Sequence, residues 1–231
     1  MQKNDSVVTM SAREQRAGLV FLVLQLLVLP RLIGFSVQLL FPKTSITEQN
    51  FAVFLLEFIA VLVLFRHFWA GSVKALIQQP GHVLLICLVA FFAYHLMTSQ
   101  LSIWIYTLMP HFSNVNDGQV GALLTWNFPL IAFCTVFLVP VVEESLYRGL
   151  IFGSLLKKST VAAYLVSVPV FCAIHVLGYL GNYPLDILLV CFVQYIPAGI
   201  CLGWAYQKSG TILAPITIHA FINALGIFSV R

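Results

Sequence analysis

Long apolar segments alternate with short polar stretches along the chain, and this pattern predicts helices that cross a membrane. A helix needs about 20 consecutive apolar residues to span the hydrocarbon of a bilayer, and the apolar segments have roughly that length. The segments lie at about residues 17–41, 51–67, 83–108, 128–157, 160–180, 184–206 and 211–229. The pattern therefore predicts an all-α polytopic membrane protein, built as a single bundle of about seven transmembrane helices.

Composition agrees with this fold class. Of the 231 residues, 60% are hydrophobic and only 9% are charged, whereas soluble domains carry roughly 25% charged residues. The five cysteines all lie in apolar segments without a CxxC pair, which indicates buried apolar residues and no disulfide framework. The first apolar segment is too long for the core of a cleaved signal peptide, so we expect it to remain as a span.

The net charge of +4 comes from basic residues in the connections, which indicates membrane orientation and not binding of nucleic acid. Lys and Arg concentrate in cytoplasmic loops. With the N-terminus inside, the inner side holds Lys3, Arg13, Arg16, Arg66, Lys74, Lys157, Lys158 and Lys208. The outer side holds Lys43 and Arg231. We therefore expect a multi-pass protein of a bacterial plasma membrane, with its N-terminus in the cytoplasm and its C-terminus outside.

Besides Arg31 and Glu57 in the first two apolar segments, ionisable side chains interrupt three of the later ones. Between residues 128 and 156 the charges are Glu143, Glu144 and Arg148, while His175 and His219 each lie in a later segment. An unpaired charge within hydrocarbon costs several kcal/mol or more, so such residues indicate a functional site.

These groups are predicted to lie at similar depths in the membrane, measured from its inner side. Glu143 lies 14 residues from the predicted inner end of its segment, His175 lies 15 residues from that side, and His219 lies 11. At 1.5 Å per residue these separations are about 21, 22 and 16 Å. The agreement predicts one shared intramembrane cavity, and it favours a continuous helix through the glutamates over a break at Pro140.

Helical spacing separates the roles of the two glutamates. Adjacent residues point about 100° apart, so Glu143 and Glu144 cannot share a helix face. Glu144 and Arg148 are four residues apart, with the acid first, which is the favourable order for an ion pair that would orient the motif. Glu143 is left free to face the cavity. His219 and Asn223 are also four residues apart and share a face.

These residue types permit activation of a water molecule. A carboxylate at low dielectric can act as general base on a bound water, and a histidine can polarise the same water. A histidine–asparagine pair can donate hydrogen bonds to a developing oxyanion. The ring of Phe171 can form a wall beside His175. Together the groups predict a peptidase without a serine or cysteine nucleophile. A carboxylate and two histidines could also coordinate zinc with one open position, although HExxH is absent.

Three motifs occur in order on three segments: EExxxR at 143–148, FxxxH at 171–175 and HxxxN at 219–223. This set resembles the CPBP family of intramembrane proteases, which includes the type II CAAX prenyl endopeptidases and the bacteriocin self-immunity (Abi) proteins. No motif position departs from the family's pattern. On this basis we expect N-terminal transmembrane helices at residues 1–119 and a CPBP-like catalytic helical core at residues 120–231, within one membrane domain.

The resemblance implies an endopeptidase that hydrolyses a peptide bond of a membrane-associated peptide or protein, of CAAX or bacteriocin/pheromone type. It implies that Glu143 and His175 activate water and that His219 and Asn223 stabilise the oxyanion. The supporting residues would be Glu144, Arg148 and Phe171. A glutamate-dependent reaction is favoured over one that needs a divalent metal such as zinc; such a metal would be held by Glu143, His175 and His219. We expect the site to open towards the cytoplasm.

Two other classes remain open at this point. One is a non-proteolytic membrane protein for bacteriocin self-immunity or partner binding. The other is a small transporter or proton relay, although clustering of the groups at one depth does not form a chain across the bilayer. The substrate, the need for prenylation and the oligomeric state stay open.

Overall fold

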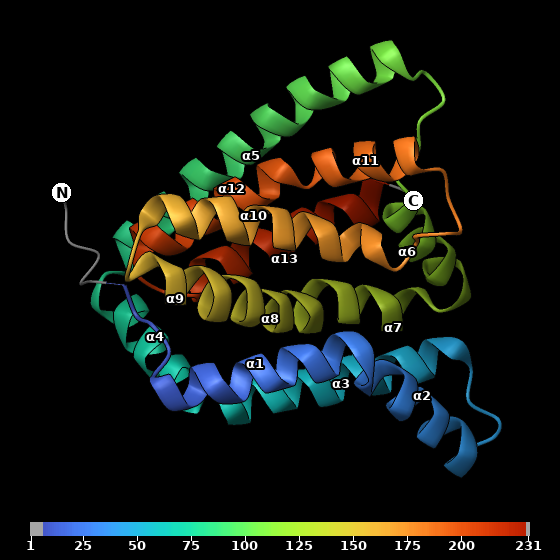
Figure 1. Ribbon diagram of the computed structural model, residues 1–231, viewed down its shortest axis with the longest axis horizontal. Helices are drawn as coiled ribbons and strands as arrows, with labels where there is room; N and C mark the ends of the chain where they lie inside the picture. Colours follow the sequence, from blue (N-terminus) through green and yellow to red (C-terminus); the bar gives the residue numbers. More distant parts are fainter. Residues whose placement is uncertain (1–6, 230–231) are drawn as a thin grey trace.

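The computed structural model describes residues 7–229; most of its long helices run side by side along one axis, and α5 is inclined to them (Figure 1). The helices are α1 Ala12–Leu27, α2 Leu29–Leu40, α3 Ile46–Leu64, α4 Arg66–Gln78, α5 Pro80–Leu108, α6 Val115–Trp126, α7 Phe128–Phe133, α8 Val139–Glu144, α9 Gly153–Leu156, α10 Thr160–Leu177, α11 Leu185–Gln194, α12 Ile196–Ser209 and α13 Leu213–Ser229, with π-helical segments η2 Cys134–Leu138 and η3 Ser145–Phe152. No β-strand occurs within the described range. The all-α prediction is confirmed.

The predicted spans correspond to helices in the structure. Within residues 7–229, five helices are long and apolar enough to cross a membrane: Ile46–Leu64, Pro80–Leu108, Phe128–Leu156, Thr160–Leu177 and Leu185–Ser209. The pair α1 and α2, bent by 60° at a short break, makes a sixth if it is one span. The apolar helix Leu213–Phe228 is shorter and packs within the same bundle. A polytopic bundle of the predicted kind is therefore present.

Local sequence signals explain several helix ends. Ser11 and Ser45 begin α1 and α3, and each forms a capping box with the glutamate three residues later, Glu14 and Glu48. Such a box satisfies backbone N–H groups that lack partners in the first turn. At the end of α12, Gly210 adopts φ 74°, the left-handed conformation that glycine provides at helix C-termini.

The helix with the glutamate pair is continuous from Phe128 to Leu156, as expected, and does not break at Pro140. It instead alternates α-helical and π-helical turns, with η2 and η3 on either side of α8. Pro140 has no N–H to donate to the carbonyl four residues earlier, and its ring crowds that carbonyl. The wider turns of η2, directly before it, accommodate both effects.

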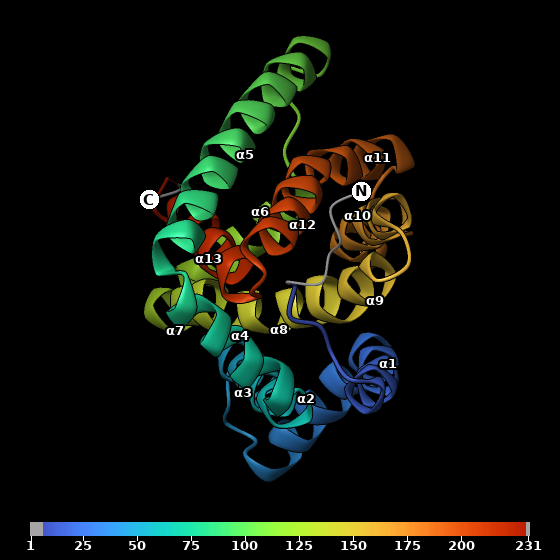
Figure 2. The ribbon, with the colours of Figure 1, turned by 90° about the vertical axis from the view of Figure 1, so that its left-hand side faces the viewer.

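This continuous helix lies between two groups of helices (Figures 1 and 2): α1 and α3 lie on one side, and α10, α12 and α13 lie on the other. Its second half forms the main hydrophobic core. The buried side chains there are Leu146, Leu150, Phe152 and Leu156, packed with Met10, Phe65, Phe68 and Tyr206. Gly149 permits the close approach, because a Cβ there would lie 2.9 Å from the ring of Phe68.

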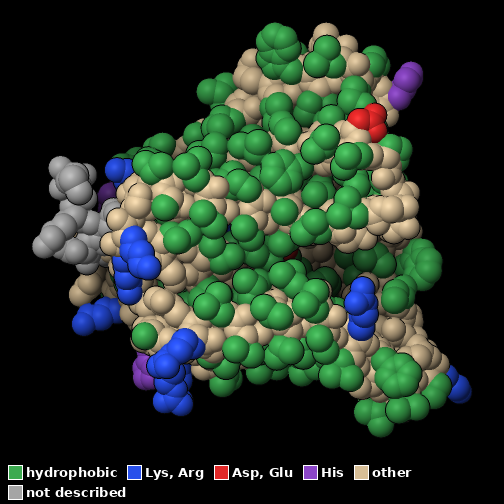
Figure 3. Space-filling view, viewed as in Figure 1, with side chains coloured by type: hydrophobic (Ala, Val, Ile, Leu, Met, Phe, Trp, Pro, Cys, Tyr) green, Lys and Arg blue, Asp and Glu red, His purple; other side chains and the backbone are tan. Residues whose placement is uncertain are grey.

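The surface of the bundle is largely apolar. Large hydrophobic side chains on α1, α5 and α10 are exposed, among them Leu27, Phe92 and Leu165. Figure 3 shows that such side chains cover the flank of the molecule, while Lys and Arg gather mainly at one end. An apolar flank of this kind is the surface that lipid chains would cover.

Candidate active site

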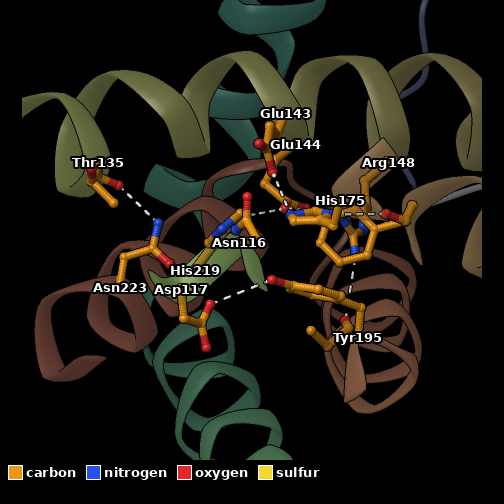
Figure 4. Close-up of polar contacts among 12 residues, drawn as sticks. Asn116, Asp117, Thr135, Glu143, Glu144, Arg148, His175, Tyr195, His219 and Asn223 are labelled. Carbon is orange, nitrogen blue, oxygen red and sulfur yellow. Dashed lines mark hydrogen bonds and ion pairs between the residues drawn. The ribbon is translucent and has the colours of Figure 1, made fainter. Parts of the chain in front are cut away.

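A cavity of about 510 Å³ lies within the bundle, between α5, α6, α8, α10 and α13. Five residues that the sequence singled out line it: Glu143, Phe171, His175, His219 and Asn223. They come from three separate helices, and Figure 4 shows their polar side chains converging. The structure therefore brings the predicted groups together around one space.

Glu143 and His175 face each other across part of this cavity. His175 Nε2 lies 3.8 Å from Glu143 Oε2. The other ring nitrogen, Nδ1, lies 2.8 Å from the carbonyl oxygen of Phe171, and because a carbonyl only accepts, Nδ1 carries the proton. In neutral His175 the lone pair of Nε2 then points towards a carboxylate oxygen that has no hydrogen-bond partner. A water molecule could donate one hydrogen to each group.

Two aromatic rings hold the imidazole of His175. Tyr195, in the turn between α11 and α12, stacks on it with 4.1 Å between ring centroids and 25° between ring planes. Phe171 meets it edge-on, with the centroids 4.7 Å apart. Phe171 was expected beside His175. Tyr195 was not expected, because nothing in its local sequence distinguishes it from other aromatic residues in the apolar segments.

Glu144 is fully buried, and its Oε1 accepts two hydrogen bonds. Arg148 Nη1 donates over 3.0 Å, which confirms the predicted ion pair between residues four apart. His219 Nδ1 lies 2.8 Å from the same oxygen, a contact that the sequence did not predict. Arg148 Nη2 also donates to the carbonyl of Ala198, and its guanidinium lies 3.9 Å from the centroid of the Phe171 ring. Glu144 thus joins two of the three motifs.

Asn223 lies one helical turn after His219 and lines the same cavity. Its Nδ2 donates to the backbone oxygen of Thr135 over 2.8 Å. Thr135 belongs to η2, where the π-helical geometry changes the usual pairing of backbone carbonyls. One amide hydrogen of Asn223 is therefore engaged, and the second remains for a group in the cavity.

The end of the cavity beside α6 carries polar groups that the sequence showed only as a loop. The Tyr195 hydroxyl lies 3.4 Å from Asp117 Oδ1 and from Asn114 Oδ1, and Figure 4 shows it directed at Asp117. Asn114 also caps α6, by accepting from the backbone N–H of Asn116 and Asp117. Water reaches Asp117 through the cavity, but the surrounding protein raises the pKa of its carboxyl group, against the lowering effects of Tyr195 and His175.

The residues considered for a metal are divided between two polar contacts. Within residues 7–229, no three or more His, Cys, Asp and Glu side chains are arranged to hold a metal ion. Glu143 and His175 form one pair, while His219 directs Nδ1 to Glu144.

The cavity extends in one direction only from the glutamate pair. On the continuous helix its lining residues are Ile131, Thr135, Val139 and Glu143, spaced four apart and none of them after Glu143. The following turns are packed in the core. The cavity thus opens towards α6 and away from Lys157 and Lys158. Lys157 and Lys158 are residues that the sequence analysis assigned to the inner side, so the cavity opens towards the other end of the bundle.

Comparisons with known proteins agree with the motifs. Residues 125–225 match the family described as type II CAAX prenyl endopeptidase Rce1-like. The UPF0177 protein YxdF of Lactococcus lactis subsp. lactis (strain IL1403) is 30% identical over 89 residues, which are 38% of this chain and 44% of that protein. The match therefore spans less than half of this relative. No solved structure matches the chain. Residues 125–225, which contain all three motifs, are therefore similar to the Rce1-like family, in agreement with the resemblance that the motifs indicated.

Proposed function

We propose that this protein is an intramembrane endopeptidase that hydrolyses a peptide bond of a membrane-associated peptide or protein, using water activated by Glu143 and His175. One observation carries the proposal. An unpartnered carboxylate oxygen of Glu143 faces Nε2 of His175 inside a cavity large enough for a peptide segment. A substrate of CAAX or of bacteriocin/pheromone type would fit this class.

The first step is attack by water on the scissile carbonyl. Glu143 takes a proton from the water as the oxygen bonds to the carbonyl carbon, while His175 holds the second hydrogen and orients the molecule. The carbonyl oxygen becomes an oxyanion. Collapse of this intermediate breaks the C–N bond, and the protonated Glu143 returns its proton to the leaving amine. Atoms and charge balance without a covalent enzyme intermediate.

In the proposed reaction, His219 and Asn223 stabilise the oxyanion. Because Nδ1 of His219 donates to Glu144, its Nε2 is the nitrogen left for the cavity, and it donates a hydrogen bond when the ring is an imidazolium. The free amide hydrogen of Asn223 supplies a second donor. Loss of one such donor costs about 10²–10³ in rate in other hydrolases.

The mechanism proposed here uses no metal, and metal removal tests that point. We expect cleavage to persist after exhaustive chelation of the purified protein, with metal content far below one equivalent by elemental analysis. Loss of activity on chelation, with recovery on addition of zinc, would instead require the carboxylate and histidines to act as ligands.

The proposed function is tested by Glu143→Gln in proteoliposomes that contain a membrane peptide substrate. Gln keeps the shape but cannot accept the proton, so we expect cleavage to fall by about 10²–10⁴-fold. Glu48→Gln is the matched control, because Glu48 is exposed at the start of α3 and Gln can also form a capping box. Normal cleavage by a folded Glu143→Gln variant would disprove the proposal.

A further inference from the structure

The two ends of the bundle differ in charge. The basic residues at the end where α1 begins and α9 ends are Arg13, Arg16, Arg66, Lys74, Lys157, Lys158 and Lys208, and the far end, around α2, has Arg31 and Lys43. Figure 3 shows Lys and Arg mainly at one end, and Lys3 and Arg231 lie outside the described residues. Since Lys and Arg concentrate on the cytoplasmic side of membrane proteins, the basic end faces the cytoplasm.

The half of the bundle next to the basic end is closed by packing. Beyond the glutamate pair, Leu146, Leu150 and Leu156 are each at most 2% exposed. They pack with Phe68 and Tyr206, which are also almost completely buried. No side chain from residues 146–157 lines the cavity. A peptide could not reach Glu143 from the basic end without opening this core.

The other helices that line the cavity point in the same direction. On α10 the lining residues are Phe171, Ile174 and His175, in its last two turns, well after its start beside Lys158. On α13 the lining begins at His219 and continues towards the C-terminus. The cavity reaches the surface at the start of α6, where Asp117 is exposed. Its mouth thus lies at the end opposite to the basic residues.

We propose that substrate reaches Glu143 and His175 from the side of the membrane opposite the cytoplasm, so that the substrate is a peptide segment exported to that side. That the molecule entering the cavity is a substrate rests on the proposed peptidase function. The direction in which the cavity opens is inferred from packing and charge alone. The inference favours the bacteriocin/pheromone type of substrate over the CAAX type. A prenylated C-terminus made in the cytoplasm would meet the half of the bundle that is closed by packing.

The charge of the cavity supports the same substrate class. Its acidic residues are Asp117 at the mouth and Glu143 inside, and no Lys or Arg occurs among the described residues that line it. A free C-terminal carboxylate would be repelled there, since like charges at an interface cost free energy unless they are compensated. An internal peptide segment with neutral or basic side chains avoids that cost.

The test places single reactive thiols at the two ends of the bundle. Gly118→Cys lies beside the mouth, where a Cβ meets nothing within 4 Å, and Lys158→Cys lies at the exposed basic end. A membrane-impermeant maleimide is applied to intact cells and to everted membrane vesicles. The wild-type protein, whose cysteines are buried except for the half-buried Cys87, serves as the blank. Gln119 is also exposed, so Gln119→Cys provides a second thiol that reports on which side of the membrane the mouth of the cavity lies.

We expect Gly118→Cys and Gln119→Cys to be labelled in intact cells to the level reached after detergent solubilisation, and Lys158→Cys only in everted vesicles. Labelling of residues 118 and 119 only from the cytoplasmic face, or failure of both to react even in detergent, would overturn the inference. The result does not depend on catalysis. An inactive protein with an outward mouth would refute the proposed function and leave the position of the mouth established.

Discussion

At the residue scale, Glu144 and Arg148 organise the site without facing the cavity. Both side chains are almost completely buried, and their contacts reach Ala198, Phe171 and His219 on three neighbouring helices. A buried pair of this kind contributes little net stability, but removal of one member leaves the other charge uncompensated. The pair therefore fixes the relative positions of the helices that carry the proposed catalytic groups.

Arg148→Met should destabilise the protein by about 3–5 kcal/mol, because it leaves the Glu144 carboxylate buried without its cation. The measurement is thermal unfolding in detergent micelles. Adding Glu144→Gln to this variant removes the orphaned charge and should restore part of the loss. An unfolding midpoint for Arg148→Met equal to that of the wild type would show that the pair has no such role.

Tyr195 should act by holding the His175 ring. Tyr195→Phe keeps the stacked ring and should retain nearly full cleavage, whereas Tyr195→Leu removes it. An aromatic pair is worth about 0.5–1.5 kcal/mol, so a loss of about 2- to 12-fold in kcat with little change in KM is expected. Steady-state kinetics on folded variants decides this. Equal activity of the Phe and Leu variants would exclude a role for the stack.

Some residues of the site could be predicted from the sequence and others could not, and the difference has a physical reason. Glu143, His175 and His219 were found because ionisable groups are rare in apolar segments and costly there. Asp117 lies in a polar loop, where such residues are ordinary, and Tyr195 is one of eight tyrosines. Asp117 becomes part of the cavity through the position of α6, and Tyr195 through the packing of α11 and α12 against α10.

At the element scale, segment length predicted the helices well, while departures from regular helix were not predicted. The break between α1 and α2 and the π-helical turns of η2 and η3 depend on local backbone pairing, which hydrophobic periodicity does not reveal. The π-helical turns matter for the site. They flank the glutamate pair, and the backbone oxygen of Thr135 in η2 accepts a hydrogen bond from Asn223.

The contact between α10 and α12 depends on a glycine. A Cβ at Gly199 would lie 2.8 Å from Val168 Cγ1, so Gly199→Ala should force the helices apart at a cost of about 1–3 kcal/mol. Unfolding midpoints in detergent test this. Val168→Ala in the same chain should recover much of the loss, and Gly81→Ala, which meets nothing within 4 Å, is the control. Absence of any recovery would contradict the steric explanation.

At the scale of the whole molecule, one half of the bundle is a packed core and the other half encloses the cavity. Depth counting from the sequence placed the three motifs at one level, and the structure brings them around one space. Counting residues could not show towards which end of the bundle the cavity extends from the three motifs. That depends on side chains such as Leu150 and Tyr206, from separate helices, filling the volume between the glutamates and the basic end.

The central claim is that Glu143 and His175 act on the same water molecule. The most direct test is a double-mutant cycle of Glu143→Gln and His175→Gln, measured as kcat for one peptide in proteoliposomes. Groups that act as a unit are strongly non-additive. We therefore predict that the double variant is about as slow as the slower single variant. Losses that multiply, or a single variant with wild-type kcat, would contradict the claim.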